Sequence, residues 1–329
     1  MLISKLGNKR RTTALVVLSL LLLGASCGSS TGSNQVAVSA NQETATTEAV
    51  TTTTEAVTTT TEAVDESTTT TEVTEPEFPE AIISLSPTAT EILFAIGAGG
   101  QVVAVDEYST YPEEAPITDL SGFTPNIEAI AEYEPDLVVI SYDPGDLVVG
   151  LELLDIDVVM QGTALSVEDT YSQITELGEL TGHSEEAQEL NDSISADLAS
   201  LAENPVGTGL TYFHEVDATL YTATSSTFIG QLYALLGLEN IADPADEQGW
   251  GYPQLSPEYI ISANPDLIFL ADAIYGESLD TLMERPGWSE ITAVQNYAVI
   301  ELNETSGRWG PRIVDFLTGI HAAITDLTS

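Results

Sequence analysis

Positively charged residues are scarce in this 329-residue sequence. Seven Lys and Arg residues face 52 Asp and Glu residues, which gives a formal net charge of −45 at pH 7. Four of the seven lie within the first eleven residues, and the other three are Arg285, Arg308 and Arg312. A chain with so few cations has no basic patch to neutralise phosphates, which excludes nucleic acid as a partner. Solubility, or adaptation to a salty habitat, explains the excess of carboxylates.

Cysteine and histidine are also rare, and motifs for nucleophilic catalysis are missing. Cys27 is the only cysteine, which excludes an intramolecular disulfide. The three histidines, His183, His214 and His321, fall in segments of different predicted structure, so neither a metal site nor a cofactor is predicted. There is no Gly-x-Ser-x-Gly elbow and no His-Glu-x-x-His zinc motif. One enzymatic alternative stays open, because paired carboxylates hydrolyse glycosides and acids are abundant here.

Residues 1–26 are predicted to be a secretory signal peptide. Basic residues precede an apolar run from Ala14 to Leu23, which is too short to span a bilayer as a permanent helix. The sequence GASC, which ends at Cys27, is similar to a lipobox. We therefore expect Cys27 to be lipidated, anchoring the exported protein to the outer face of the cytoplasmic membrane through lipid alone. The alternative is an ordinary signal peptide followed by an unmodified cysteine.

Residues 27–79 combine this cysteine with a tether rich in Thr and Glu. TTTTEAV occurs at 51–57 and again at 58–64. Four consecutive threonines per repeat leave no apolar seam, so a coiled coil is excluded. The composition buries too little apolar surface to offset the entropy of ordering, which predicts a disordered stalk, with O-glycosylation left open.

Residues 82–115 predict a strand, a capped helix and a second strand. A short apolar run comes first. Ser86 or Thr88 then caps a helix with Pro87 in its first turn, and Glu91 is available for a capping box from Thr88. Glycines end the helix before the next apolar run. This pattern is typical of the opening unit of an α/β domain.

An internal repeat divides the rest of the chain. Glu128 is followed seven residues later by PDLVVI, and Glu258 is followed seven residues later by PDLIFL. Each copy predicts a short helix, a Pro-Asp turn and a fully apolar strand of the kind buried in a parallel sheet. The repeat therefore predicts two α/β lobes with one copy in each.

Helical spacing runs through an otherwise polar segment between the two copies. The apolar positions there are Ala187, Leu190, Ile194, Leu198 and Leu201. A buried face is likewise predicted for the last helix, at Ile313, Phe316, Leu317, Ile320 and Ile324. The predicted organisation is a signal peptide at 1–26, a lipidated tether at 27–79, an N-terminal α/β lobe at 80–183, a linking helix at 184–205 and a C-terminal α/β lobe at 206–329.

From residue 82 onward the sequence resembles the binding proteins that deliver cobalamin and ferric siderophores to ABC importers. The opening IISLSPTATEILFAIGAGGQVVAV and the two Pro-Asp repeats around one long helix carry the resemblance. It implies two lobes with mostly parallel sheets joined by a single backbone helix, the class III periplasmic-binding-protein architecture, with little relative motion. It also implies a monomeric binding protein, and not an enzyme, that acts with an ABC permease dimer and its ATPase.

The resemblance implies one ligand in the cleft between the lobes. The candidate ligand-binding residues are Tyr108, Tyr111, Phe123, Tyr142, Trp250, Tyr252, Glu304, Arg308 and Trp309. Their placement in polar or Gly/Pro-rich loops favours ligand contact over core packing. Glu128 and Glu258 match the positions that dock on arginines of the permease, although stabilisation of the helix dipole is an alternative role. Arg312, at the start of the last helix, is expected to be structural.

The scarcity of positive charge restricts the predicted cargo. Ferric catecholates and ferric citrate carry several negative charges, which need clustered Arg or Lys to offset desolvation. The chain therefore favours a neutral or cationic metal chelate, with cobalamin or another corrinoid ahead of a ferric siderophore of the hydroxamate type. The predicted function is capture of this ligand and its delivery to the permease. Alternatives are a tethered cell-surface hydrolase with paired carboxylates and a sensor that passes the ligand to a receptor.

Overall fold

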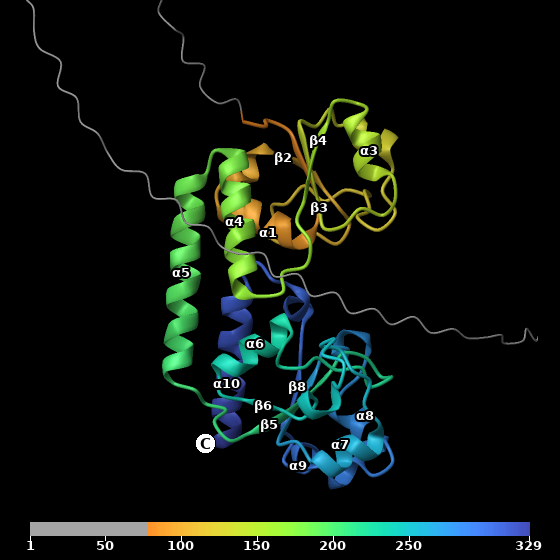
Figure 1. The fold of residues 1–329 in the computed structure, drawn as a ribbon, viewed down its shortest axis with the longest axis vertical. Coiled ribbons are helices and arrows are strands. Elements are labelled where there is room, and N and C mark those ends of the chain that lie inside the picture. The colour runs from red at the N-terminus through yellow and green to blue at the C-terminus, as the bar shows by residue number, and fades with distance from the viewer. Residues whose placement is uncertain (1–77) are drawn as a thin grey trace, which may run out of the picture. The chain divides into compact units, whose positions relative to one another are not determined.

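The computed structural model describes residues 78–329, which form two α/β lobes joined by one long helix (Figure 1). The predicted signal peptide, the lipidation site Cys27 and all but the end of the tether lie outside the described residues. Within residues 78–329, no helix has both the length and the apolar character that crossing a membrane requires.

The first lobe is built on a parallel sheet in the order β2-β1-β3-β4. Its strands are β1 (Ile82–Leu85), β2 (Val102–Val105), β3 (Leu137–Ile140) and β4 (Asp157–Met160). Its helices are α1 (Pro87–Ala95), η1 (Ala98–Gln101), α2 (Ile127–Ala131), α3 (Leu147–Glu152) and α4 (Val167–Thr181).

The second lobe repeats this topology, with a parallel sheet in the order β6-β5-β7-β8. Its strands are β5 (Thr211–Glu215), β6 (Glu239–Asn240), β7 (Leu267–Leu270) and β8 (Val299–Glu301). Its α-helices are α6 (Phe228–Leu235), α7 (Pro257–Ala263), α8 (Leu279–Glu284), α9 (Thr292–Gln295) and α10 (Ile313–Thr328). Short 3₁₀ helices are η2 (Asp243–Ala245), η3 (Ala273–Tyr275), η4 (Trp288–Glu290) and η5 (Glu304–Gly307). The fold class predicted from the repeat and the resemblance is confirmed.

The two Pro-Asp repeats occupy equivalent interior strands, and their aspartates fasten the neighbouring strand. All four residues of β3 and of β7 are buried. Asp136 Oδ2 accepts hydrogen bonds from the backbone N–H groups of Glu80 (2.8 Å) and Ala81 (2.9 Å), just before β1. Asp266 Oδ2 accepts bonds of 2.9 Å from both the backbone N–H and the hydroxyl of Thr211, at the start of β5. In each repeat, the aspartate therefore bonds to the start of the neighbouring strand, and the apolar residues that follow it form a buried strand.

Helix α1 begins where the sequence predicts, but its cap differs from one of the expectations. Ser86 Oγ accepts a hydrogen bond from the backbone N–H of Ala89 (3.4 Å). The predicted capping box between Thr88 and Glu91 is wrong, because Thr88 lies inside the helix and the Glu91 side chain is buried in an ion pair. Gly97, with φ of 89°, follows the helix in the left-handed conformation that glycine favours.

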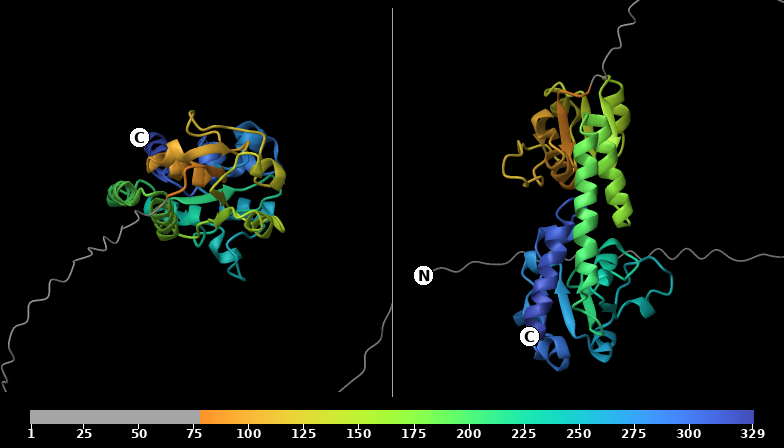
Figure 2. Two further views of the ribbon diagram at one scale, coloured as in Figure 1. Left: turned by 90° about the horizontal axis from the view of Figure 1, so that it is seen from above. Right: turned by 90° about the vertical axis from the view of Figure 1, so that its left-hand side faces the viewer.

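Helix α5 (Ser184–Glu203) spans both lobes. Its 20 residues make a rod of about 30 Å at 1.5 Å per residue. In the right-hand view of Figure 2, α5 lies in front, with α10 (blue) on one side and α4 (yellow-green) on the other, and it contacts both helices. The buried face predicted for α10 is confirmed at all five of its positions.

One hydrophobic core continues from the first lobe into the second. It includes Ile92 of α1, Leu177 of α4, Ile194 of α5, Tyr233 of α6 and Leu317 of α10. The opposite face of each sheet has a separate core of its own. Because the shared core lies on the side of the sheets that faces α4, α5 and α10, it holds the two lobes in a fixed orientation.

Removal of the Asp266 carboxylate should destabilise the protein. We expect Asp266→Ala to lower the free energy of unfolding by about 2 kcal/mol, because two hydrogen bonds to a charged acceptor are lost. Denaturant titration followed by circular dichroism measures the change. Asp197→Ala, on the exposed face of α5, is the control and should be neutral. Equal effects of the two substitutions would contradict this role of Asp266.

Candidate functional site

The carboxyl ends of the strands in the two lobes border one cleft. Loops at these ends form the ligand sites of parallel α/β sheets. Loops after β1, β2, β3 and β4 line one side, and loops after β5, β7 and β8 line the other. The cleft has a volume of about 850 Å³, and small-molecule sites span roughly 300–1,000 Å³. The repeated topology thus produces a single space of suitable size for a ligand.

Seven of the nine predicted ligand-binding residues line this cleft: Tyr108, Phe123, Tyr142, Tyr252, Glu304, Arg308 and Trp309. The rings of Tyr108 and Phe123 meet edge to face with centroids 5.5 Å apart. The rings of Phe123 and Tyr142 lie 6.2 Å apart. These three exposed rings form the aromatic wall of the cleft: Tyr108 and Phe123 come from the loop between β2 and α2, and Tyr142 comes from the loop after β3.

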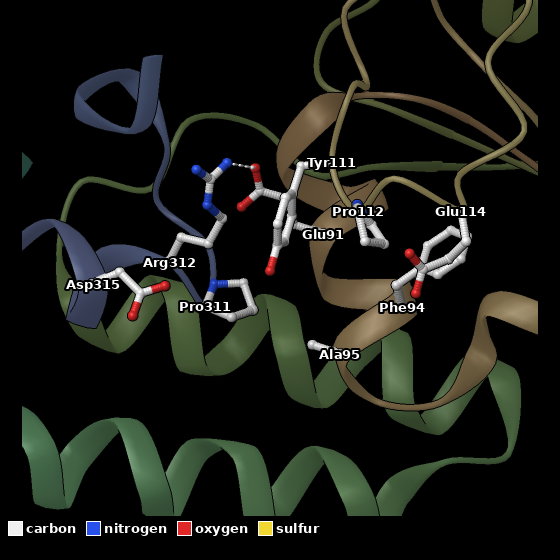
Figure 3. Close-up of a pocket in the computed structure, with 9 residues that line it drawn as sticks. All are labelled: Glu91, Phe94, Ala95, Tyr111, Pro112, Glu114, Pro311, Arg312 and Asp315. Carbon is white, nitrogen blue, oxygen red and sulfur yellow. Dashed lines mark hydrogen bonds and ion pairs between the residues drawn. The ribbon is translucent and has the colours of Figure 1, made fainter. Parts of the chain in front are cut away.

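The other two predicted residues lie elsewhere. The Tyr111 ring faces Arg312, whose guanidinium carbon lies 4.3 Å from the ring centroid. This ring lines a smaller pocket next to α1 and α10, drawn in Figure 3. Trp250 is 79% exposed and does not line the cleft. The structure therefore brings seven candidates together and leaves apart these two, which come from the same loops as Tyr108 and Tyr252.

Several residues that line the cleft are not among the predicted ligand-binding residues, for example Asp106, His214, Ile229 and Ile274. Asp106 directly follows β2, so the strand-end rule that selects Tyr108 also selects it. Ile229 and Ile274 offer no such signal, because isolated apolar residues are typical of the core. His214 lies within β5 and reaches the cleft through its side chain, which depends on packing around that strand.

Asp106 is a buried carboxyl group at the edge of the cleft. Ser109 Oγ donates a hydrogen bond of 2.6 Å to its Oδ1. Burial raises the pKa of Asp106, and this hydrogen bond opposes the shift. A Cβ added at Gly122 would lie 2.6 Å from the Leu85 carbonyl oxygen and 3.0 Å from Asp106 Oδ2. Only glycine therefore fits this point of the cleft lining.

His214 is a neutral imidazole beneath the cleft. It is 4% exposed, and its Nδ1 forms a hydrogen bond of 3.2 Å with the Tyr233 hydroxyl. Burial lowers the pKa of His214 from 6.5 to about 4. The imidazole is therefore uncharged at neutral pH and adds no positive charge to the cleft.

Four charged residues form an ion-pair network where the lobes meet, and we call Glu91, Glu304, Arg308 and Arg312 the Glu91 network. Glu91 Oε1 lies 3.2 Å from Arg312 Nη1 and 3.8 Å from Arg308 Nε. Arg312 Nη2 lies 3.3 Å from Glu304 Oε1. Figure 3 shows Glu91 on α1 reaching Arg312 across the lobe boundary. Burial raises the pKa of Glu91, and the positive charge of Arg312 opposes the shift. The expectation that Arg312 is structural agrees with these contacts.

The third arginine is occupied inside the second lobe. Arg285 Nη1 and Nη2 donate hydrogen bonds of 2.7 and 2.6 Å to the two carboxylate oxygens of Glu215, which is fully buried. Arg285 also pairs with Glu277 (2.7 Å) and lies over the Trp288 ring. Each arginine among residues 78–329 thus already faces at least one carboxylate.

Trp309 connects the lobes at the cleft. Its indole Nε1–H donates a hydrogen bond of 3.1 Å to Gln173 Oε1 on α4. Its backbone carbonyl accepts one of 2.7 Å from the Thr170 hydroxyl on the same helix. A residue that lines the ligand space is therefore fixed by both lobes.

The predicted docking residues occupy matching exposed sites. Glu128 lies in the first turn of α2 after the N-cap Asn126, and Glu258 lies in the first turn of α7 after the N-cap Ser256. Neither carboxylate forms a salt bridge within residues 78–329. Both side chains are therefore free to meet a partner.

Within residues 78–329, no group of three His, Cys, Asp or Glu side chains is arranged to hold a metal ion.

A sequence profile described as periplasmic binding protein matches residues 82–305, more than half of the chain. The chain belongs to the periplasmic binding protein family, so the predicted resemblance is confirmed at the level of the family.

Individual relatives agree with this assignment. The uncharacterized ABC transporter substrate-binding lipoprotein YvrC of Bacillus subtilis (strain 168) is 31% identical, over 74% of this chain and 79% of its own length. A vitamin B12-binding protein of Pectobacterium carotovorum is 28% identical, over 76% and 90%. A solved structure from Staphylococcus epidermidis, described as a possible iron-binding (periplasmic solute-binding) protein, is 27% identical with a TM-score of 0.66, over 75% and 99%.

Burial of His214 should make the free energy of unfolding decrease as the pH falls. Its pKa is about 4 in the folded protein and near 6.5 when exposed, so its contribution is complete above pH 6.5 and is lost as pH falls towards 4. The loss should reach about 3 kcal/mol. The measurement is the difference in unfolding free energy between wild type and His214→Gln at pH 7 and pH 4. A difference that does not change with pH would contradict burial of a neutral imidazole.

Proposed function

We propose that this protein is the substrate-binding lipoprotein of an ABC importer and captures a corrinoid or a ferric siderophore in the cleft between its lobes. The observation that carries the proposal is the aromatic wall of Tyr108, Phe123 and Tyr142 on one face of a cleft that both lobes border. Exposed rings supply a large apolar contact surface with little loss of conformational entropy. The names of the B12-binding and iron-binding relatives support the same class of cargo.

The charges around the cleft favour a neutral or cationic chelate, with a corrinoid ahead of a ferric hydroxamate. Arg308 is already paired, and Asp106 and Glu304 add carboxylates to the lining. A highly anionic catecholate would lose its hydration there without gaining free cations. The matched relatives are binding proteins, and they do not support the alternative of a hydrolase acting through paired carboxylates.

The proposed partners are a permease dimer and its ATPase, which the loaded monomer reaches while anchored by lipid at Cys27. Glu128 and Glu258 are the proposed docking groups, because the repeat places one exposed carboxylate at the same helix start in each lobe. No resident cofactor takes part, since the metal chelate is cargo. The name of YvrC, a substrate-binding lipoprotein of an ABC transporter, supports both the partners and the anchor.

Titration with candidate ligands tests the proposal directly. We expect cyanocobalamin or a ferric hydroxamate to quench the fluorescence of the purified protein, chiefly through Trp309 in the cleft. Phe123→Ala should weaken binding about tenfold, because it removes the central ring of the aromatic wall. Tyr133→Ala, an exposed aromatic outside the cleft, is the control and should bind as wild type does. Absence of binding by every corrinoid and ferric chelate would contradict the proposal.

Docking is tested separately from binding. The double variant Glu128→Ala/Glu258→Ala should keep its ligand affinity within about twofold, because both residues lie outside the cleft. Uptake by reconstituted permease and ATPase should fall at least about tenfold, as expected when two charged contacts are removed. Glu132→Ala/Glu284→Ala removes two other exposed carboxylates and is the control. Unchanged uptake in Glu128→Ala/Glu258→Ala would instead favour the sensor alternative, in which the protein passes the ligand to a receptor.

A further inference from the structure

Glu91 is a carboxylate outside the cleft that contacts the arginine inside it. Its side chain is 3% exposed and comes from α1 of the first lobe, whereas Arg308 lines the cleft from the second lobe. In Figure 3, Glu91 lies beside Arg312 and the Tyr111 ring, in the wall of the small pocket. Its Oε1 forms ion pairs with both arginines. Its Oε2 has no hydrogen-bond partner among residues 78–329.

The Glu91 network is balanced in charge. Arg308 and Arg312 supply two positive charges, and Glu91 and Glu304 supply two negative charges. Arg308 is the only Arg or Lys that lines the cleft within residues 78–329. Arg308 is therefore the one cationic side chain of the described lining that an anionic ligand would meet.

Because it is buried, Glu91 offsets the charge of the arginines more strongly than Glu304 does. The Glu304 side chain is 54% exposed, so water screens its charge. Glu91 is shielded from water, and its interaction with the arginines is correspondingly stronger. Asp106, the buried acid that lines the cleft itself, bonds to Ser109 and forms no salt bridge among the described residues.

We infer that Glu91 is a specificity-determining residue: by neutralising Arg308 and Arg312 from behind the cleft wall, it makes the site reject anionic metal chelates and accept uncharged ones. The inference rests on the proposed function, which it deepens by naming the residue that selects the charge of the cargo. Glu91 acts through the arginines, without touching the ligand, so it is a positioning residue.

The test compares two probes on the full-length protein. Wild type and Glu91→Gln are titrated with cyanocobalamin and with a triply anionic ferric tris-catecholate. Glu91→Gln keeps the shape of the side chain and leaves one uncompensated positive charge. We expect its affinity for the anionic chelate to rise about tenfold, as one charge a few ångströms away implies, and its affinity for cyanocobalamin to change less than about twofold.

Two controls separate charge from structure. Glu91→Gln/Arg312→Gln restores the charge balance without touching the cleft lining, so it should return the ratio of the two affinities to the wild-type value. Glu114→Gln removes a carboxylate from the same small pocket that forms no ion pair within residues 78–329, and it should leave the ratio unchanged. If the Glu91→Gln ratio of affinities changed because the structure was damaged, the second substitution would not restore it.

The outcomes distinguish the inference from the function on which it rests. An unchanged ratio in Glu91→Gln, in a protein whose wild type binds cyanocobalamin, would overturn the role of Glu91 alone. Failure of wild type to bind either probe, together with failure to bind any ferric hydroxamate, would contradict the proposed function itself. Should Glu91→Gln not fold, Glu304→Gln removes the exposed carboxylate of the same network. It should shift the ratio in the same direction by about threefold, and no shift there would also overturn the inference.

Discussion

The hydrophobic core shared by the two lobes is the constraint on which the site depends. Helices α1, α4, α5, α6 and α10 contribute to one continuous set of buried side chains, so the lobes cannot separate without exposing apolar surface to water. Both sheets are parallel and have the same strand order, and each therefore presents its carboxyl ends at one edge. Because the core fixes the orientation of the lobes, these two edges face one another and enclose a cleft. Trp309, which bonds to α4 across that cleft, adds a polar connection to the apolar one.

Burial of a carboxylate at this junction determines how the scarce positive charges are used. Glu91 lies on the helix that the shared core buries, and a buried charge is tolerated only when it is paired. Two of the three arginines in the described chain meet that need, and Arg285 meets the equivalent need of Glu215. Each arginine of the described chain is thus paired with a carboxylate, and the rings of Tyr108, Phe123 and Tyr142 supply exposed apolar surface in the cleft.

Regular patterns in the sequence predict most of the fold. The repeat around Glu128 and Glu258 identifies β3 and β7, and the apolar spacing at Ala187, Ile194 and Leu198 identifies α5, because period and burial are local properties of the chain. Strand-end aromatics such as Tyr108 and Tyr142 follow from the same patterns. The pairing of Glu91 with Arg312 does not, since 221 residues separate them and only packing brings them together. For the same reason Glu91 resembles a capping residue in the sequence, and His214 resembles an ordinary strand residue.

A rigid junction also limits how such a protein distinguishes its ligands. Where lobes close through a large hinge motion, the energy of closure adds to discrimination. We expect a long helix and a continuous core to allow little such motion. On the proposed function, recognition then resides in groups that are already in place: the aromatic wall, the narrow approach at Gly122 and the balanced charges of the Glu91 network. Preorganised charge acts before contact is complete, because it changes the cost of desolvating the ligand as it enters. On the proposed function, a molecule of this charge would reject anions provided that no arginine in the cleft is left unpaired.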